Sequence, residues 1–210
     1  MKHTITVGAT GEASAEPDIT VIDLGVAVVR PTVAEATAEG AAAAHRLVDA
    51  LVTAGVAADD IHTSRYSLQP EYDYSGSEPR LRGYRLANTV TAQVRDVAAT
   101  GAVLDAATAA GGDATVVDGI RFSLGDSTAL VSAARAAAWE SARAKAAQLA
   151  DLAGAALGAV LAINEGAGPA GPRPLFAAAK MAAEAAPPIL PGETSVSVSL
   201  TVTFAIGSSQ

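Results

Sequence analysis

Few residues of this 210-residue chain have the types and spacing that metal chemistry requires. The three histidines, His3, His45 and His62, are far apart, and no two of them lie at helical or strand spacing. A metal site normally shows paired ligands at such spacing. We therefore expect no bound metal, and we interpret the histidines as solvated or locally hydrogen-bonded side chains.

Nucleophilic and phosphate-binding motifs are also missing from the sequence. There is no cysteine, no Gly-x-Ser-x-Gly segment, and no glycine-rich loop with a phosphate-binding lysine. Asp59 and Asp60 are adjacent, and neighbours on a strand point to opposite faces, so we interpret them as structural rather than as a catalytic pair. The sequence predicts no catalytic residue and no cofactor, and the function class it favours is not an enzyme.

Lys145 is the titratable residue with the most unusual predicted position. It falls on the apolar arc of a long helix predicted over residues 129–158. A desolvated lysine has a lowered pKa and can act as a base or a Schiff-base nucleophile. We favour the alternative, an ion pair with an acidic residue of the sheet or of a neighbouring subunit, which makes Lys145 a structural polar candidate.

The long helix is the dominant predicted element, because alanine has the highest helix propensity. Its apolar arc contains Leu130, Val131, Leu149 and Leu152. Trp139 falls on the opposite arc, which predicts a large aromatic side chain on the outer side of the helix. We interpret it as a contact surface, the alternative being a solvent-exposed tryptophan.

The remaining periodicity predicts an α+β fold. We expect strands over residues 4–10, 19–30, 61–74, 82–94, 116–124, 159–163 and 195–204, and helices over 33–54 and 97–110 in addition to 129–158. This order is strand, strand, helix, strand, strand, helix, strand, helix, strand, strand. Strands with one apolar and one polar face indicate a mainly antiparallel sheet with helices packed on one face. We expect a single domain over residues 1–210, with a Gly, Pro and Ala-rich excursion at 165–191.

The hairpin predicted over residues 61–94 concentrates residues typical of protein interfaces. Its arms are too long to be covered by one domain, so its tip should protrude. All four tyrosines lie on it, together with three arginines, and such residues are enriched in interfaces. The alternative is an ordinary hairpin stabilised by cross-strand pairs. The interface candidates of the chain are Tyr66, Tyr72, Tyr74, Arg80, Arg82, Tyr84, Arg85, Trp139 and, in the excursion, Phe176.

Composition excludes two kinds of partner. The net charge of -8 has no basic patch to bind a phosphate backbone, so we expect no nucleic acid. Polar residues or glycines interrupt every apolar run before it reaches the roughly 20 residues of a membrane span. The first residues enter a strand pattern without the apolar core of a signal peptide, which predicts a cytoplasmic protein.

Several stretches, in order along nearly the whole chain, carry a family resemblance. They are Ile5-Thr6-Val7-Gly8, Gly11-Glu12, Pro17-Asp18, Asp59-Asp60-Ile61-His62-Thr63, Leu68-Gln69-Pro70-Glu71-Tyr72, Gly83-Tyr84-Arg85, Asn88, Val94-Arg95-Asp96, Leu104-Asp105-Ala106, Ile120-Arg121-Phe122-Ser123-Leu124, Ala134-Arg135-Ala136-Ala137-Ala138, Ala142-Arg143-Ala144-Lys145-Ala146 and Pro191-Gly192-Glu193. With them the sequence resembles the SIMPL-domain family of oxidative stress defence and periplasmic immunogenic antigen-like proteins. The first residues of the sequence do not show the signal-peptide pattern that many members of the family have, and Trp139 stands where an aspartate is usual.

The resemblance implies an α+β protein that assembles into high-order rings or channel-like oligomers, with a loose link to oxidative stress defence and no catalytic residues to carry over. Our leading hypothesis is therefore a non-enzymatic, self-assembling homo-oligomer. The second hypothesis is a binding or carrier module with a pocket between sheet and helices, and an enzyme is the third. A further protein or small-molecule partner is left open by the sequence.

Overall fold

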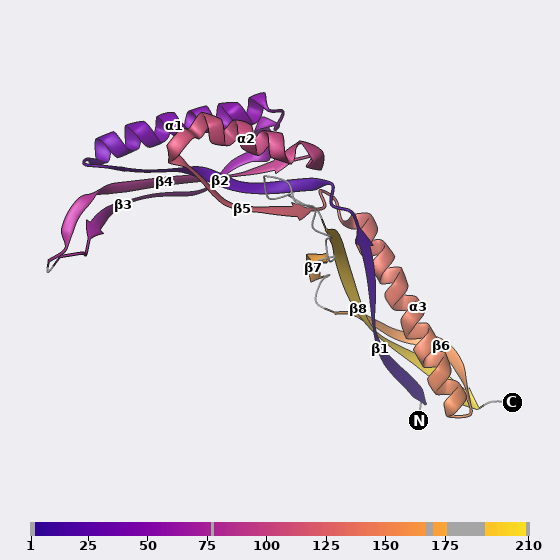
Figure 1. The fold of residues 1–210 in the computed structure, drawn as a ribbon. Coiled ribbons are helices and arrows are strands. Elements are labelled where there is room, and N and C mark those ends of the chain that lie inside the picture. The colour runs from indigo at the N-terminus through magenta and orange to yellow at the C-terminus, as the bar shows by residue number, and fades with distance from the viewer. Residues whose placement is uncertain (1–2, 77, 167–169, 176–191, 209–210) are drawn as a thin grey trace, which may run out of the picture. The chain divides into compact units, whose positions relative to one another are not determined.

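The computed structural model describes residues 3–76, 78–166, 170–175 and 192–208 (Figure 1). They pack into two compact units. The central unit contains the described residues of 18–123. The terminal unit contains those of 3–17 and 124–208.

The central unit is a four-stranded antiparallel sheet with helices on one face (Figure 1). The strand order is β3 (Ile61–Asp73), β4 (Arg80–Val94), β2 (Ile19–Arg30) and β5 (Thr115–Ser123). The helices are α1 (Val33–Thr53) and α2 (Thr100–Gly111), and short 3₁₀ turns cover Ala58–Asp60, Val97–Ala99 and Gly112–Ala114. The unit therefore has one face covered by helices, and we call the other the open face.

Local signals in the sequence explain how α1 begins and which side it buries. The Thr32 side chain accepts a hydrogen bond from the Glu35 backbone N–H, and the Glu35 carboxylate accepts one from the Thr32 backbone, which forms a capping box. The buried side of α1 packs on the apolar face of β2 and β4. The central core is made of Ile22, Leu24, Val26, Ala43, Leu47, Leu51, Val56, Val90, Ala92, Val94, Val103 and Ala107.

The terminal unit is a second antiparallel sheet covered by one helix, α3 (Thr128–Leu152). Strand β8 (Glu193–Ser208) lies between β1 (Thr4–Ala15) and β6 (Ala155–Glu165), and the short β7 (Ala170–Leu175) also pairs with β8. The strand predicted over residues 195–204 lies within β8, and its apolar side chains alternate on the buried face, because Val196, Val198, Leu200, Val202 and Phe204 are all buried.

Helix α3 buries alanines rather than the leucines that the sequence pattern assigned to its inner side. Ala134, Ala138, Ala142, Ala146 and Ala150 are buried at four-residue steps, whereas Leu149 and Leu152 are exposed. The reason is the short distance between helix and sheet. A Cβ on Gly11 of β1 would collide with backbone atoms of Ala134 and Ala138 and would lie 2.7 Å from the carbonyl carbon of Ala137, so only small residues fit there.

The predicted α+β class and antiparallel pairing are confirmed, with differences of detail. The described residues form two four-stranded sheets instead of one, and β7 adds a strand to the predicted order. Strand β1 continues to Ala15, beyond the end at residue 10 that the sequence pattern predicts. The long helix ends at Leu152 rather than near residue 158, because Gly154 takes a φ of 62° that alanine would resist. The single domain stays a prediction.

Candidate functional site

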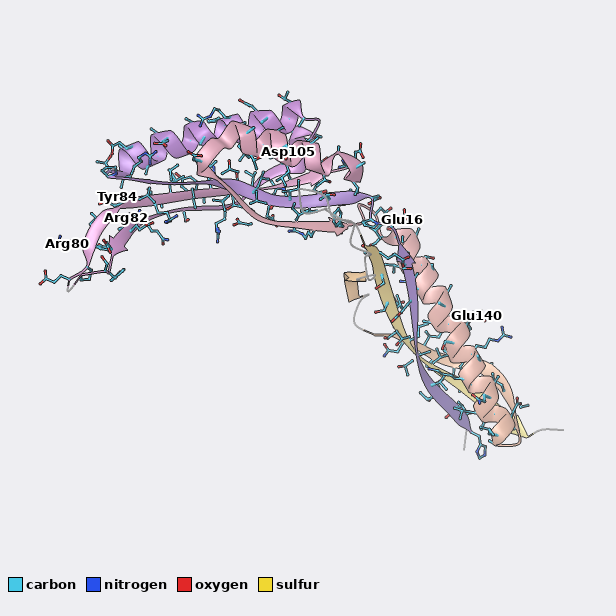
Figure 2. All side chains as sticks on the ribbon, viewed as in Figure 1. Glu16, Arg80, Arg82, Tyr84, Asp105 and Glu140 are labelled. Atoms are coloured by element: carbon cyan, nitrogen blue, oxygen red, sulfur yellow. The ribbon has the colours of Figure 1, made fainter. Side chains whose placement is uncertain are left out.

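The strand pair β3 and β4 forms the predicted long hairpin, and its closed end extends beyond α1 (Figure 1). Figure 2 shows Arg80 near this end, with Arg82 and Tyr84 further along β4. All the predicted hairpin residues lie on these two strands except Tyr74, which directly follows β3. Phe176, the candidate from the excursion, lies outside the described residues, as does most of the excursion itself.

Strand β3 presents a row of apolar side chains on the helix-covered face of the sheet. Leu68 pairs with Leu86, which is buried under α1, and strand alternation puts Tyr66 and Tyr72 on the same side as Leu68. Their exposed fractions are 57% for Tyr66, 37% for Leu68 and 44% for Tyr72. The apolar face of the sheet is therefore wider than the helices that cover it.

The hairpin arginines contribute differently. Arg85 forms a close ion pair with Glu71, and Arg82 lies 3.3 Å from the same carboxylate, so Glu71 links β3 to β4 where the pairing register shifts between Glu71 and Tyr72. Arg80 is exposed. At the end of β3, the ring of Tyr72 on the strand and the ring of Tyr74 just after it are tilted against each other, with centroids 6.3 Å apart. This pair keeps two aromatic side chains at the outer end of the hairpin.

Trp139 and Lys145 do not lie where the sequence pattern put them. Trp139 is half-buried and packs against Phe204, with ring centroids 6.2 Å apart, so the outer-side prediction is wrong. Lys145 is exposed rather than on the buried side. Its Nζ donates a hydrogen bond of 3.1 Å to the Gly8 carbonyl of β1, and within the described part of the chain no carboxylate pairs with it. Both errors follow from the misassigned face of the alanine-rich helix.

The open face of the central sheet carries a polar cluster that the sequence analysis missed. Asp23 in the middle of β2 accepts a hydrogen bond from the Thr91 hydroxyl and pairs with Arg121. The Thr91 hydrogen bond, together with Arg121, lowers the pKa of Asp23 below its ordinary value, and His62 adds a smaller favourable charge. The one sequence signal was a carboxylate at the centre of a mostly apolar strand.

Two β-bulges frame this cluster. The pairing register shifts at Ser64 in β3 and at Asp118 in β5, on opposite edges of the sheet. The Ser64 hydroxyl lies 3.3 Å from the Thr89 carbonyl, and the Thr89 hydroxyl donates a hydrogen bond of 3.3 Å to Asp118. A β-bulge changes the direction in which the neighbouring side chains point, which allows these contacts. The hydrophobic periodicity of the sequence does not show where the bulges occur.

A pocket of about 390 Å³ lies where α1 ends, β4 ends and α2 begins. Its apolar lining includes Val94, Ala99 and Val103, and its polar lining includes Asp60, Arg95 and Asp96. Arg95 binds Asp60 through two hydrogen bonds of 2.7 Å, and these bonds lower the pKa of Asp60. The pocket is formed by the ends of these elements, and the carrier hypothesis, which places a pocket between sheet and helices, stays a prediction.

Neither a metal centre nor a membrane-spanning helix is found in the part of the chain that the structure describes. No group of three or more His, Cys, Asp or Glu residues there has the geometry to hold a metal ion. No helix among the same residues is long and apolar enough to cross a bilayer. Most of the polar side chains of the hairpin, the open face and the pocket instead form hydrogen bonds or ion pairs with one another.

These features define an antiparallel α+β protein with an exposed hairpin, and comparison with known proteins identifies its family. The SIMPL family model, described as a protein of unknown function (DUF541), matches residues 5–204. The chain therefore belongs to the SIMPL family.

Its relatives are bacterial proteins with little functional description. The 26 kDa periplasmic immunogenic protein of Brucella melitensis is 33% identical over 216 residues, which cover 96% of this chain and 84% of that protein. The protein of the same name from Brucella abortus matches to the same extent. The uncharacterized protein YggE of Escherichia coli K12 is 30% identical over 109 residues, covering 52% of this chain and 44% of that protein. None of these names describes an enzyme.

The comparisons correct one expectation from the sequence. We expected a cytoplasmic protein, but the Brucella relatives that match 96% of the chain are named as periplasmic proteins. The expectation rested on the first few residues alone, and those residues carry less information on location than a match along the whole chain.

Proposed function

We propose that the chain is a non-enzymatic protein that assembles with copies of itself into a high-order homo-oligomer, and that it does so in the periplasm. The observation that carries the proposal is the row of Tyr66, Leu68 and Tyr72 on β3. Each of these side chains is more than a third exposed, and within the described residues the outer edge of β3 pairs with no other strand.

An exposed apolar row beside an unpaired strand edge favours association with another chain. Backbone N–H and C=O groups on such an edge can pair with another chain, and natural monomers usually block them. Pro70 removes only one donor from this edge, opposite Tyr84. Tyrosine adds large contact area with a polar group, which suits a surface that is wet in the free chain and buried in an assembly.

Location and biological role have separate support. The names of the Brucella relatives support a periplasmic location. The link to oxidative stress defence rests on the family resemblance alone. Since the chain contains no cysteine, any such contribution would not use a thiol of this protein.

The test compares the assembly of two variants by light scattering after size-exclusion chromatography. The double variant Tyr66→Ser/Tyr72→Ser removes the aromatic row, and Leu152→Ser is the matched control, because Leu152 is 78% exposed on α3 in the terminal unit. We expect the double variant to have a lower mass than the wild type and the control to keep it.

Each outcome is informative because both changes are at exposed positions that should cost little folding stability. A double variant that keeps the wild-type mass, with an unchanged circular dichroism spectrum, would remove the hairpin from the assembly. Loss of mass in the Leu152→Ser control alone would assign the assembly to the terminal unit instead.

A further inference from the structure

The pocket at the end of the central sheet is lined by more acidic than basic side chains. Two carboxylates, Asp60 and Asp96, and one guanidinium, Arg95, line it. Arg95 is already paired in a two-bond arrangement with Asp60, so its charge is matched. The Asp96 carboxylate caps the turn that leads into α2, where it accepts a hydrogen bond from the Ala98 backbone N–H at 3.0 Å. It adds one negative charge, which the positive end of that turn offsets in part.

The end of α1 increases this negative bias. Ala54 and Gly55, which follow the last turn of α1, also line the pocket. A helix C-terminus carries a partial negative charge, and the last turn of α1 contains no basic residue to neutralise it.

The apolar lining of the pocket comes from the central core. Val94 and Val103 are almost fully buried and come from β4 and α2, so the lining is anchored in the central core. A volume of about 390 Å³ lies at the lower end of the range of small-molecule sites. An aliphatic group can contact these side chains while a charged end remains at the acidic rim, which is formed by Asp60 and Asp96.

We propose that this pocket binds a small organic cation, a primary ammonium on a short aliphatic body. The ammonium lies near Asp96 and the end of α1, and the alkyl chain lies against Val94, Ala99 and Val103. The inference is independent of self-assembly, because all the lining residues belong to the central unit and none lies on the tyrosine row of β3.

The test is a titration of the full chain with n-butylammonium chloride, followed through the methyl NMR signals of Val94, Ala99 and Val103. Methyl signals remain observable in large assemblies, and sodium chloride at equal ionic strength corrects for screening. Sodium butyrate and 1-butanol are the matched ligands, because they keep the alkyl chain and change only the charge. We expect saturable shifts with n-butylammonium, weaker shifts with 1-butanol and none with butyrate.

Two variants separate the charge from the cavity. Asp96→Asn removes the carboxylate but keeps a residue that can cap the same turn, and we expect it to weaken n-butylammonium binding about fivefold or more. Ala99→Leu fills the cavity and should abolish binding. Glu140→Gln makes the same change of net charge on the exposed surface of α3 and should leave the affinity unchanged (Figure 2).

The proposal is overturned if butyrate and n-butylammonium bind equally, since the acidic rim would then select nothing. It is also overturned if n-butylammonium gives no saturable shift at these three methyl groups in the folded wild-type chain. An equal loss of affinity in Asp96→Asn and Glu140→Gln would show general charge attraction rather than a site.

Discussion

The Thr89 hydroxyl donates its hydrogen bond to Asp118 across an intervening strand, since Thr89 is on β4, Asp118 is on β5, and β2 lies between them. Gly25 is the residue of β2 that pairs with Thr89. Because Gly25 has no side chain, the Thr89 and Asp118 side chains can meet over the backbone of β2. The open-face cluster therefore depends on a glycine in the middle of a central strand.

Substitution of Gly25 by alanine should destabilise the chain by about 1–3 kcal/mol, the usual range for overpacking. An added Cβ would collide with the Asn88 carbonyl oxygen and would lie 2.7 Å from Thr89 Cα, and this backbone cannot move without disturbing the core. Gly119→Ala on β5 is the control, because nothing lies within 4 Å of a Cβ there. Urea unfolding of both variants measures the difference, and equal stabilities would show that β4 adapts to the extra atom.

Gly11→Ala should have a comparable effect in the terminal unit. The added Cβ would meet the backbone of α3 at Ala134 and Ala138, which would push the helix away from β1 and loosen the contacts of the buried alanines. Gly8→Ala lies on the same strand with no atom within 4 Å of its Cβ, and it should leave the melting temperature almost unchanged. A stable Gly11→Ala variant would mean that α3 packs less closely than described.

These two glycines also test whether the chain is one domain. If residues 1–210 fold as a single cooperative domain, differential scanning calorimetry should show one transition, and Gly11→Ala and Gly25→Ala should each lower its temperature. The two glycines belong to different compact units. Two transitions, each shifted by only one of the variants, would contradict the single-domain prediction.

The Asp60 and Arg95 pair predicts a pH dependence of stability. Hydrogen bonds from Arg95, followed by its charge, lower the pKa of Asp60 in the folded chain below the unfolded value of about 3.9. The pair therefore stabilises the fold above about pH 4, and its contribution is lost as the pH falls through the folded pKa of Asp60.

Asp60→Asn should accordingly be less stable than the wild type at pH 7, with a difference that shrinks below about pH 4. Asp59→Asn is the control, because Asp59 is the exposed neighbour of the buried Asp60. Chemical unfolding at pH 7, 5 and 3 measures both variants. A difference for Asp60→Asn that is constant across this range would show that the ion pair does not set it.

Features determined by near neighbours in the sequence were predictable, and features determined by packing were not. The capping box of Thr32 and Glu35 and the alternation of the last strand follow from local spacing, and both are present. The inner face of α3 depends on how closely the helix approaches Gly11. A pattern that ranks leucine above alanine therefore chose the wrong side, and it misplaced Trp139 and Lys145 with it.

The candidate sites divide in the same way. The tyrosines of the hairpin were predictable, because their positions in one predicted strand pair follow from the sequence. The open-face cluster required the pairing of β2 with β4 and β5 and the bulges at Ser64 and Asp118, which only the folded chain specifies. The pocket requires the ends of three elements to meet, and Arg95 and Asp60 are 35 residues apart in the chain.

Self-assembly is the central claim, and the mass of the wild-type particle in solution tests it most directly. Sedimentation velocity of the full chain at several micromolar concentrations should give a stable species of several times the mass of one chain. A particle with the mass of one chain at all these concentrations would contradict the claim.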